Sequence, residues 1–303
     1  MKYSKPALNF EQQANLLIKR GLIVPEHEAL VHLLMKVNYY RLSGYLYTFK
    51  KIDPITSEES FVPGTNLDTI VQRYEFDRKL RILLMDAIER IEVAILRTQF
   101  VQAHVLRYGP FGYTDKKNYS PDLSSTEYSL LMSDVSGDET RSSEEFIKRY
   151  RTKYFEEDYL PFWMAVEIMS FGQLYTIYRK SERNIKMSIA SQFGLHSIVF
   201  DSWLHTLNYI RNACAHHVRL WNRPLPIAPL FPYKKNDPNW YEPVLISNQR
   251  VFAVLTITRY LLQRIDDKTS WPGSLDKLLN EYPQVPKKMM GFPENWQKCK
   301  YWQ

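Results

Sequence analysis

The sequence predicts an all-α protein, and two observations carry that prediction. The segment from Asn66 to Tyr108 contains neither glycine nor proline, and its apolar residues recur at spacings of three and four, as on one face of a helix. The region before it divides into shorter segments without a convincing alternation of apolar and polar residues. Because 45% of the 303 residues are hydrophobic, the chain can fill a sizeable core.

Three short helices are predicted before the long one. They are separated by Gly21, by Pro25 and by the region around Asn38, which are typical breaks between helices. The predicted helices cover residues 9–22, 26–37 and 39–51. Together they form an N-terminal helical region over residues 8–50.

The long helix has recognisable ends and two charged residues near its apolar face. Thr65 or Asn66 can cap its start, and Gly109 ends it. Arg73 and Asp77 are four residues apart and project onto or beside the apolar face. They predict either a buried ion pair or a polar site, and the ion pair is the favoured interpretation.

The second half of the chain is also predicted to be helical. Residues 109–141 are rich in Gly, Ser, Asp and Tyr and predict a long loop or an insertion. Ser142 begins the Ser-x-x-Glu pattern of a capping box, so helices resume there. Residues 222–243 are rich in proline and predict a surface loop. Further helices are predicted over residues 142–154, 160–180, 184–194, 197–218, 246–265 and 274–282.

We expect one large helical domain over residues 1–303, with a core at about 65–225 and C-terminal helices within 247–290.

The composition and charge of the chain limit the class of protein. The net charge of +7 favours a polyanionic partner. Cys214 and Cys299 are too few for a disulfide framework, which fits a reducing cytoplasm. We expect no signal peptide and no membrane association.

Residues 207–224, "LNYIRNACAHHVRLWNRP", concentrate cationic and imidazole side chains at the end of a predicted helix. Arg211 and His216 form an RxxxxH pattern. The neighbouring candidates for auxiliary or RNA-binding roles are Asn212, His217, Arg219, Trp221 and Arg223.

The bare pattern of arginine and histidine is common by chance, so other matches are expected. Arg20 with His27 and Arg97 with His104 match a slightly looser spacing. Pro25 interrupts the first pair. A snorkelling arginine and a surface histidine explain the second pair. The density of polar side chains around the third match distinguishes it from these two.

Arg211 and His216 do not share a face of a regular helix, because five residues correspond to a rotation of about 140°. The sequence leaves two solutions. Either the helix is distorted there, or two copies of the chain face each other and supply two arginines and two histidines to one cleft. A two-fold dimer would do this automatically, because its interface is self-complementary.

Such a cleft suits phosphodiester chemistry. One imidazole can take the proton from an RNA 2′-hydroxyl while another protonates the leaving 5′-oxygen. Guanidinium groups bind phosphate oxygens and stabilise the charge that develops in the transition state. Asn212 can orient a phosphate or a neighbouring histidine. This mechanism needs no metal and no other cofactor.

Other interpretations stay open. Histidine and arginine late in a helix also interact favourably with its negative end, so Arg219 and Arg223 can be caps or ion-pair partners. A zinc site would use His205, Cys214, His216 and His217, but neither HExxH nor CxxC is present. Trp221 is more often a packing residue than a platform for a base.

Three acidic residues lie among apolar helix positions and are candidates to support the site. They are Asp77, Glu92 and Glu167. The alternative is that each is an internal ion-pair partner, which is the commoner role of a carboxylate in such a position.

The sequence around Arg211 and His216 resembles that of the Abi-like (AbiD/AbiF) family of bacterial abortive infection proteins. "RNACAHHVRLWNR" is similar to the family's pattern, and so are residues 21–51, 61–98, 160–179 and 200–225, in that order. The resemblance implies membership of the HEPN superfamily, whose helical bundles often act as metal-independent ribonucleases with RxxxxH shared across a dimer. It implies an HEPN-like helical bundle as the core, with N-terminal and C-terminal helical additions.

The resemblance also implies catalytic roles for Arg211 and His216 and a polar role for Asn212. The leading hypothesis is a homodimeric toxin-type endoribonuclease in phage defence, which leaves 2′,3′-cyclic phosphate and 5′-hydroxyl ends. Its partners would be an RNA substrate and, as in some relatives, a small structured antitoxin RNA. The alternative hypothesis is a non-catalytic RNA-binding module with a regulatory or sensing role.

Overall fold

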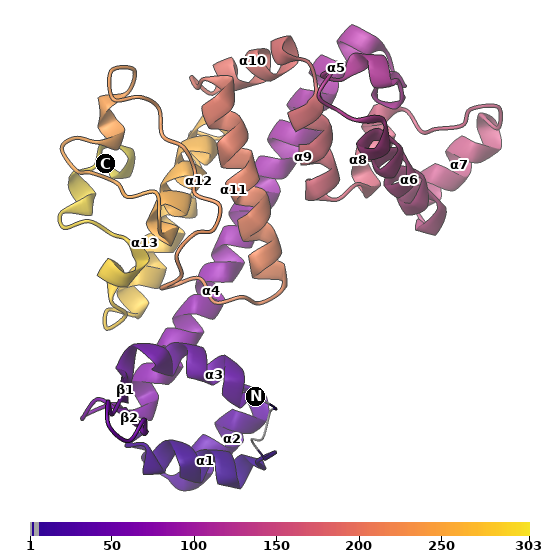
Figure 1. Cartoon of the computed structure of the whole chain (residues 1–303). Coiled ribbons are helices and arrows are strands. Elements are labelled where there is room, and N and C mark those ends of the chain that lie inside the picture. Colours follow the sequence, from indigo (N-terminus) through magenta and orange to yellow (C-terminus); the bar gives the residue numbers. More distant parts are fainter. Residues whose placement is uncertain (1, 3–5) are drawn as a thin grey trace. The chain divides into compact units, whose positions relative to one another are not determined.

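The structure, a computed structural model, describes residue 2 and residues 6–303. Most of the described residues are helical, which confirms the all-α prediction (Figure 1). The chain forms two compact units, one of Met1–Arg81 with Ser274–Pro286 and one of Ile82–Gly273 with Lys287–Gln303. The prediction of a single large domain over the whole chain stays a prediction.

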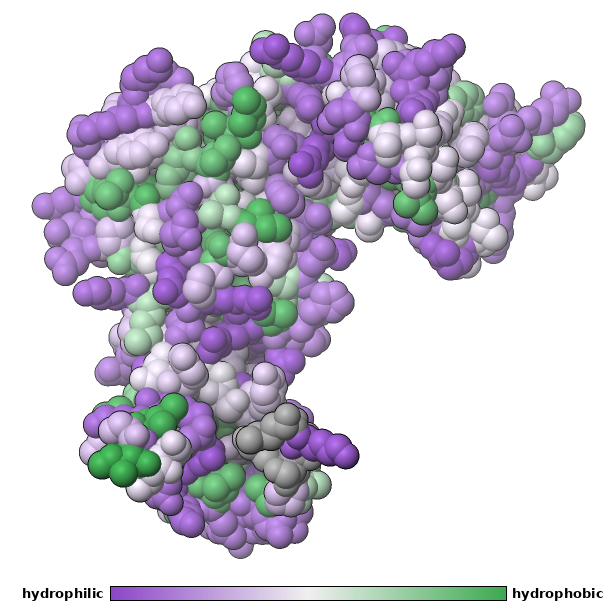
Figure 2. Space-filling view, in the orientation of Figure 1, coloured by the Kyte–Doolittle hydropathy of each residue, from purple (hydrophilic) through white to green (hydrophobic). Residues whose placement is uncertain are grey.

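The face of the molecule shown in Figure 2 is mostly hydrophilic, with apolar side chains in scattered patches. Within the described residues, no helix combines the length and the apolar character that a membrane span requires.

The N-terminal unit contains the three predicted short helices. They are α1 (Phe10–Lys19), α2 (His27–Lys36) and α3 (Tyr39–Leu46). A one-turn 3-10 helix, η1 (Tyr47–Phe49), follows α3, and a short hairpin then replaces the predicted end of the third helix. Strands β1 (Lys50–Ile52) and β2 (Glu59–Phe61) pair antiparallel. Such short strands are too brief to show an alternating pattern in the sequence.

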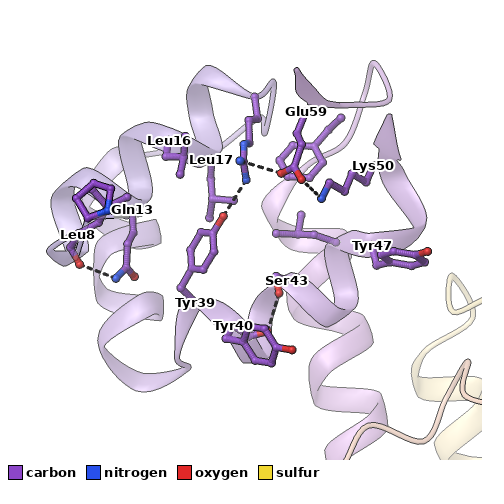
Figure 3. A pocket seen from close by; sticks show the side chains of 14 residues that line it. Leu8, Gln13, Leu16, Leu17, Tyr39, Tyr40, Ser43, Tyr47, Lys50 and Glu59 are labelled. Atoms are coloured by element: carbon purple, nitrogen blue, oxygen red, sulfur yellow. Dashed lines mark hydrogen bonds and ion pairs between the residues drawn. The ribbon is translucent and has the colours of Figure 1, made fainter. Parts of the chain in front are cut away.

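An ion pair connects the hairpin of this unit to Arg20 at the end of α1, and a hydrogen bond connects the same arginine to α3 (Figure 3). Glu59 on β2 accepts from Arg20 at 2.8 Å and also pairs with Lys50 on β1. Arg20 donates in addition to the hydroxyl of Tyr39 at 2.9 Å. One carboxylate therefore holds two cations at the surface of the unit.

Asp77 has an internal, structural role. Its side chain is fully buried, accepts from the Tyr45 hydroxyl at 2.7 Å and forms an ion pair with Arg81. Arg73 is buried as well and donates to the Thr48 hydroxyl at 2.6 Å, and burial lowers its pKa to about 10. Asp77 therefore lies in a buried ion pair whose cation is Arg81, and the pairing of Asp77 with Arg73 stays a prediction.

The predicted long helix is continuous in the chain but not uniform. It comprises α4 (Leu67–Ile91), the π-helix η2 (Glu92–Phe100) and α5 (Val101–Tyr108). Asn66 caps its start, because its side-chain oxygen accepts from the amide of Thr69 at 2.9 Å. Gly109 ends it with φ of +80°, a conformation that favours glycine. The π-helical segment was not predicted.

The region predicted as a loop or insertion is partly helical. Residues 109–124 contain only the 3-10 turns η3 (Gly112–Thr114) and η4 (Lys116–Asn118), but α6 (Ser125–Arg141) follows. A reciprocal capping box between Ser124 and Glu127 begins α6. The capping box predicted at Ser142 is wrong, because α7 (Glu145–Lys153) begins after Glu144 without a side-chain cap.

The remaining helices follow the predicted order. The apolar run at 160–180 divides into α8 (Phe162–Ile168) and α9 (Phe171–Lys180), and α10 (Arg183–Gln192) and α11 (Ser197–Ala215) come next. The proline-rich loop contains one 3-10 turn, η5 (Pro238–Trp240). Beyond it lie α12 (Val251–Ile265), α13 (Trp271–Glu281), η6 (Lys287–Met290), η7 (Trp296–Lys298) and η8 (Lys300–Trp302).

His104 on α5 is not the surface histidine that the sequence suggested. It is fully buried, with its ring 4.9 Å from that of Tyr108, 5.0 Å from that of Phe162 and 5.9 Å from that of Phe100. Neither ring nitrogen has a hydrogen-bond partner among the described residues. Burial lowers the pKa of His104 to about 4, because no group compensates its charged form.

This burial predicts a loss of stability in acid. Between the ordinary histidine pKa of 6.5 and the folded-state value of about 4, the unfolded chain binds the proton and the folded chain does not. The free energy of unfolding should therefore fall by about 2 to 3 kcal/mol between pH 7.5 and pH 4.5. Urea denaturation of the wild type and of His104→Leu at both pH values measures this part. If both proteins lose the same stability, His104 does not titrate as described.

Candidate active site at the end of helix α11

Helix α11 buries one face and ends with a tight turn at the predicted site. Its last helical residue is Ala215. The amide of Val218 donates back to the Ala213 carbonyl at 2.8 Å, and the amide of His217 donates to the Cys214 carbonyl at 3.0 Å. These two bonds define a Schellman turn, which satisfies the last carbonyls of a helix.

His217 occupies the left-handed position of this turn, with φ of +56°. Glycine is the usual residue there, and other residues pay for the crowding of their Cβ atom. Strained backbone of this kind concentrates at functional sites. The end of the helix also bears on the separation of about 140° that a regular helix would impose on Arg211 and His216. Because the helix ends before His216, regular helical rotation does not fix the His216 side chain relative to that of Arg211. A departure from the regular helix within one chain, the first of the two solutions that the sequence leaves open, therefore has a structural basis.

The strain predicts opposite effects of one substitution on stability and on function. His217→Gly should raise the free energy of unfolding by about 0.5 to 1 kcal/mol, because glycine adopts the left-handed conformation without strain. If the imidazole contacts RNA, the same substitution should weaken RNA cleavage or binding. Chemical denaturation and an RNA assay on one preparation measure both. His217→Asn, which tolerates this conformation, is the matched control, and lower stability of the glycine variant would contradict the account.

The structure places most of the candidate side chains at the surface. Asn212, His216 and His217 are exposed, while Arg211, Arg219 and Arg223 are half-buried. Arg211 donates to the Asn212 side-chain oxygen at 3.4 Å. In the described part of one chain, Arg211 and His216 share no hydrogen bond.

Trp221 does not fit the RNA-contacting role among the auxiliary candidates. Its side chain is fully buried, so neither ring face is available to a base. Packing, the commoner role of tryptophan, is the one observed. As for the alternative zinc site, no group of three His, Cys, Asp or Glu residues in the described ranges is arranged to hold a metal ion.

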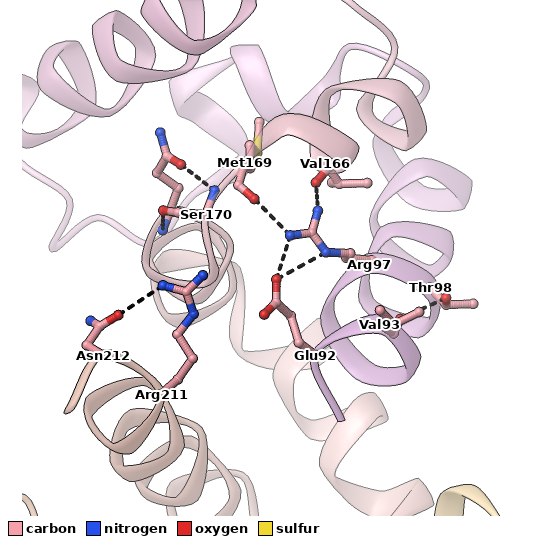
Figure 4. Close-up of polar contacts among 10 residues, drawn as sticks. Glu92, Val93, Arg97, Thr98, Val166, Met169, Ser170, Arg211 and Asn212 are labelled. Carbon is pink, nitrogen blue, oxygen red and sulfur yellow. Dashed lines mark hydrogen bonds and ion pairs between the residues drawn. The ribbon is translucent and has the colours of Figure 1, made fainter. Parts of the chain in front are cut away.

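The N-terminus of helix α9 lies beside Arg211. The two helices run antiparallel, because Tyr175 stacks on His205 with ring centroids 5.4 Å apart, and a Cβ atom at Gly172 would lie 3.9 Å from the Asn208 amide. The next turn of α11 carries Arg211, which points toward the start of α9 at Ser170 (Figure 4). The positive end of a helix and a guanidinium together favour an anionic group such as phosphate.

Arg97, which the sequence suggested to be a snorkelling arginine, holds the turn between α8 and α9. Arg97 donates to the Met169 carbonyl at 2.9 Å and to the Val166 carbonyl, and it pairs with Glu92 at 2.5 Å (Figure 4). The residues are five apart, so the π-helix η2 brings them to the same side. Glu92 is therefore an ion-pair partner of Arg97, and it supports the site only through this turn. Glu167 is exposed on α8.

A second arginine that the sequence did not indicate holds the loop after the site. Arg250 donates to the Asn222 carbonyl at 2.6 Å, and the amide of Leu225 donates to the Gln249 carbonyl at 2.9 Å. With the buried Trp221, these bonds anchor the segment that carries Arg219 and Arg223. Arg250 lies beyond the proline-rich loop, so spacing along the chain does not reveal it.

Comparison with known protein families identifies a match over most of the chain. The family model described as Abi-like protein matches residues 32–222, which include α11, Arg211, His216 and Arg97. Helix α1 and the region from Arg223 onward lie outside the match. No curated protein and no solved structure matches the chain.

Proposed function

Since the chain belongs to the Abi-like protein family, which suggests a role in abortive infection of phage-infected cells, we propose that it is a metal-independent endoribonuclease. It cleaves RNA by attack of the 2′-hydroxyl on the adjacent phosphate. The products carry a 2′,3′-cyclic phosphate and a 5′-hydroxyl. The HEPN-type arrangement of Arg211 and His216 carries out this reaction.

One observation supports the proposal above the others. Arg211 lies on the last turns of α11 beside the positive end of α9, and two exposed histidines follow at the Schellman turn. A phosphate held by Arg211 would therefore have imidazole groups near it, and imidazole exchanges protons near neutral pH. His216 acts as the general acid or base. Arg211 stabilises the negative charge of the transition state.

The surrounding cations have a binding role in this proposal. Arg219 and Arg223 extend from the anchored loop and contact phosphates on either side of the scissile bond. Asn212 accepts from Arg211 and so orients the guanidinium. Phosphate contacts set the position of the RNA but carry no sequence information.

We further propose that the working unit is a homodimer in which two copies of this site face each other. Arg211 and His216 share no hydrogen bond in the described part of one chain, and a two-fold axis beside α11 would bring the partner's histidine to this arginine. A small structured antitoxin RNA is a partner that this class of site can accommodate, since it presents the same phosphate groups as a substrate.

Mixed dimers test whether the site is shared. Arg211→Ala and His216→Ala subunits should each be inactive alone. After mixing and exchange, half of the dimers are mixed, and each mixed dimer has one intact shared site. Cleavage should therefore recover to about a quarter of the wild-type rate. If no activity returns while exchange is demonstrated, both residues act within one chain and the shared site is wrong.

A further inference from the structure

A groove in the N-terminal unit lies outside everything assigned so far. It has a volume of about 630 Å³ and lies between α1, α3 and the hairpin (Figure 3). Its floor is apolar, with Leu17 and Leu46 almost fully buried. A volume of this size is within the range of small-ligand sites. Because the groove is far from closed, it would accept part of a longer molecule.

Two tyrosine rings project from one side of this groove. Tyr40 is 86% exposed and Tyr47 is 68% exposed, and both line the groove. They are seven residues apart, so they lie on the same face of the helical segment, about 10 Å from each other along its axis. Exposed rings in a row are the typical platform on which single-stranded nucleic acid stacks its bases.

The polar atoms of the groove fit the same kind of ligand. Arg20 and Lys50 share the single carboxylate of Glu59, so this cluster keeps a net positive charge for a phosphate. At the other end, Gln13 lines the groove and its amide nitrogen donates to the Leu8 carbonyl at 2.8 Å, while its side-chain oxygen is buried.

We propose that this groove binds single-stranded RNA, with bases stacked on Tyr40 and Tyr47 and a phosphate at Arg20 and Lys50. A bare phosphate would not use the two exposed rings. The same chemistry fits single-stranded DNA, and the choice of RNA rests on the proposed function. The N-terminal unit would then supply RNA contacts in addition to those of the cleavage motif.

Binding of an uncleavable oligonucleotide to the full-length protein tests the groove alone. A fluorescent 12-nucleotide 2′-O-methyl oligouridylate lacks the attacking hydroxyl, so cleavage cannot interfere. Tyr40→Ala and Tyr47→Ala should each weaken its binding about 10-fold, since each removes a stacking platform. Tyr40→Phe and Tyr47→Phe keep the rings and should bind like the wild type. Met35→Ala removes a side chain that is 61% exposed on α2 and serves as the control.

The salt dependence of binding tests the phosphate contact in the groove, and a duplex probe tests the stacking of bases. Lys50→Ala should reduce the slope of affinity against salt by about one phosphate contact. The same oligonucleotide annealed to its complement should bind the groove weakly, because its bases are no longer available for stacking. A DNA strand of equal length and sequence that binds as tightly as the RNA analogue would contradict the choice of RNA, and the shared nucleotide chemistry would stand.

Crosslinking locates the bound strand and separates failure of the groove from failure of the nuclease. A 4-thiouridine at the centre of the oligonucleotide should crosslink to the peptide containing Tyr40 and Tyr47. Unchanged affinity of both alanine variants, no binding at all, or crosslinks only to residues 211–223 would overturn the groove proposal. Groove binding without cleavage of ordinary RNA would leave it standing and count against the proposed nuclease.

Discussion

Substitution of His216 by alanine is expected to lower the rate of RNA cleavage by about 100- to 10,000-fold, while the protein stays folded. This is the usual contribution of a general acid or base. His216 is exposed beyond the end of α11, so its removal leaves no cavity and no buried unsatisfied group. Cleavage is measured under single-turnover conditions, with circular dichroism and thermal unfolding as the check on folding.

The matched control is His196→Ala at the opposite end of the same helix. This substitution removes a side chain that accepts from the Ile198 amide at 3.3 Å, and it should leave cleavage within a few-fold of wild type. Arg211→Ala should resemble His216→Ala, because both act on the same transition state. Cleavage by His216→Ala at the wild-type rate would remove this histidine from the mechanism.

The second large effect concerns Arg97, whose role is to hold the start of α9. Arg97→Leu should lower the free energy of unfolding by about 3 kcal/mol or more, because it leaves Glu92 buried without a cation. It also frees the carbonyls of Val166 and Met169, which now accept from the guanidinium. Urea denaturation at neutral pH measures the loss.

A double substitution tests the cause of that loss. Glu92→Gln combined with Arg97→Leu removes the uncompensated charge, so the double variant should be more stable than Arg97→Leu alone. RNA cleavage should stay impaired in both, because the turn before α9 has lost its anchor. Equal stability of the single and double variants would contradict the role of the ion pair.

The fold was largely predictable where a helix has a clear spacing of apolar residues and recognisable residues at both ends. Residues 66–108 show the spacing of a helix, and the Asn66 cap and the end at Gly109 follow from their side chains. The π-helix within it has no such sign, because the apolar residues keep a spacing that also fits an α-helix. Helix α6 was missed because its composition, rich in Ser and Asp, is typical of loops.

The candidate site was predictable as a local cluster but not as an arrangement. The sequence shows that Arg211 and His216 are close together in the chain. The structure adds that α11 ends at Ala215, before His216, and that a turn at His217 follows. Burial of Trp221 and His104 depends on distant segments, so a local pattern does not reveal it. The same is true of Arg97 and Arg250, which act on carbonyls far away in the sequence.

The central claim is metal-independent cleavage of RNA by attack of its own 2′-hydroxyl. The most direct test incubates the full-length protein with an end-labelled structured RNA in excess EDTA, and identifies the ends of the fragments. The account predicts cleavage with 2′,3′-cyclic phosphate and 5′-hydroxyl ends, and no cleavage when the 2′-hydroxyl at the cut site is replaced by hydrogen. Fragments with 5′-phosphate and 3′-hydroxyl ends, or salt-sensitive binding of RNA without any cleavage, would contradict it.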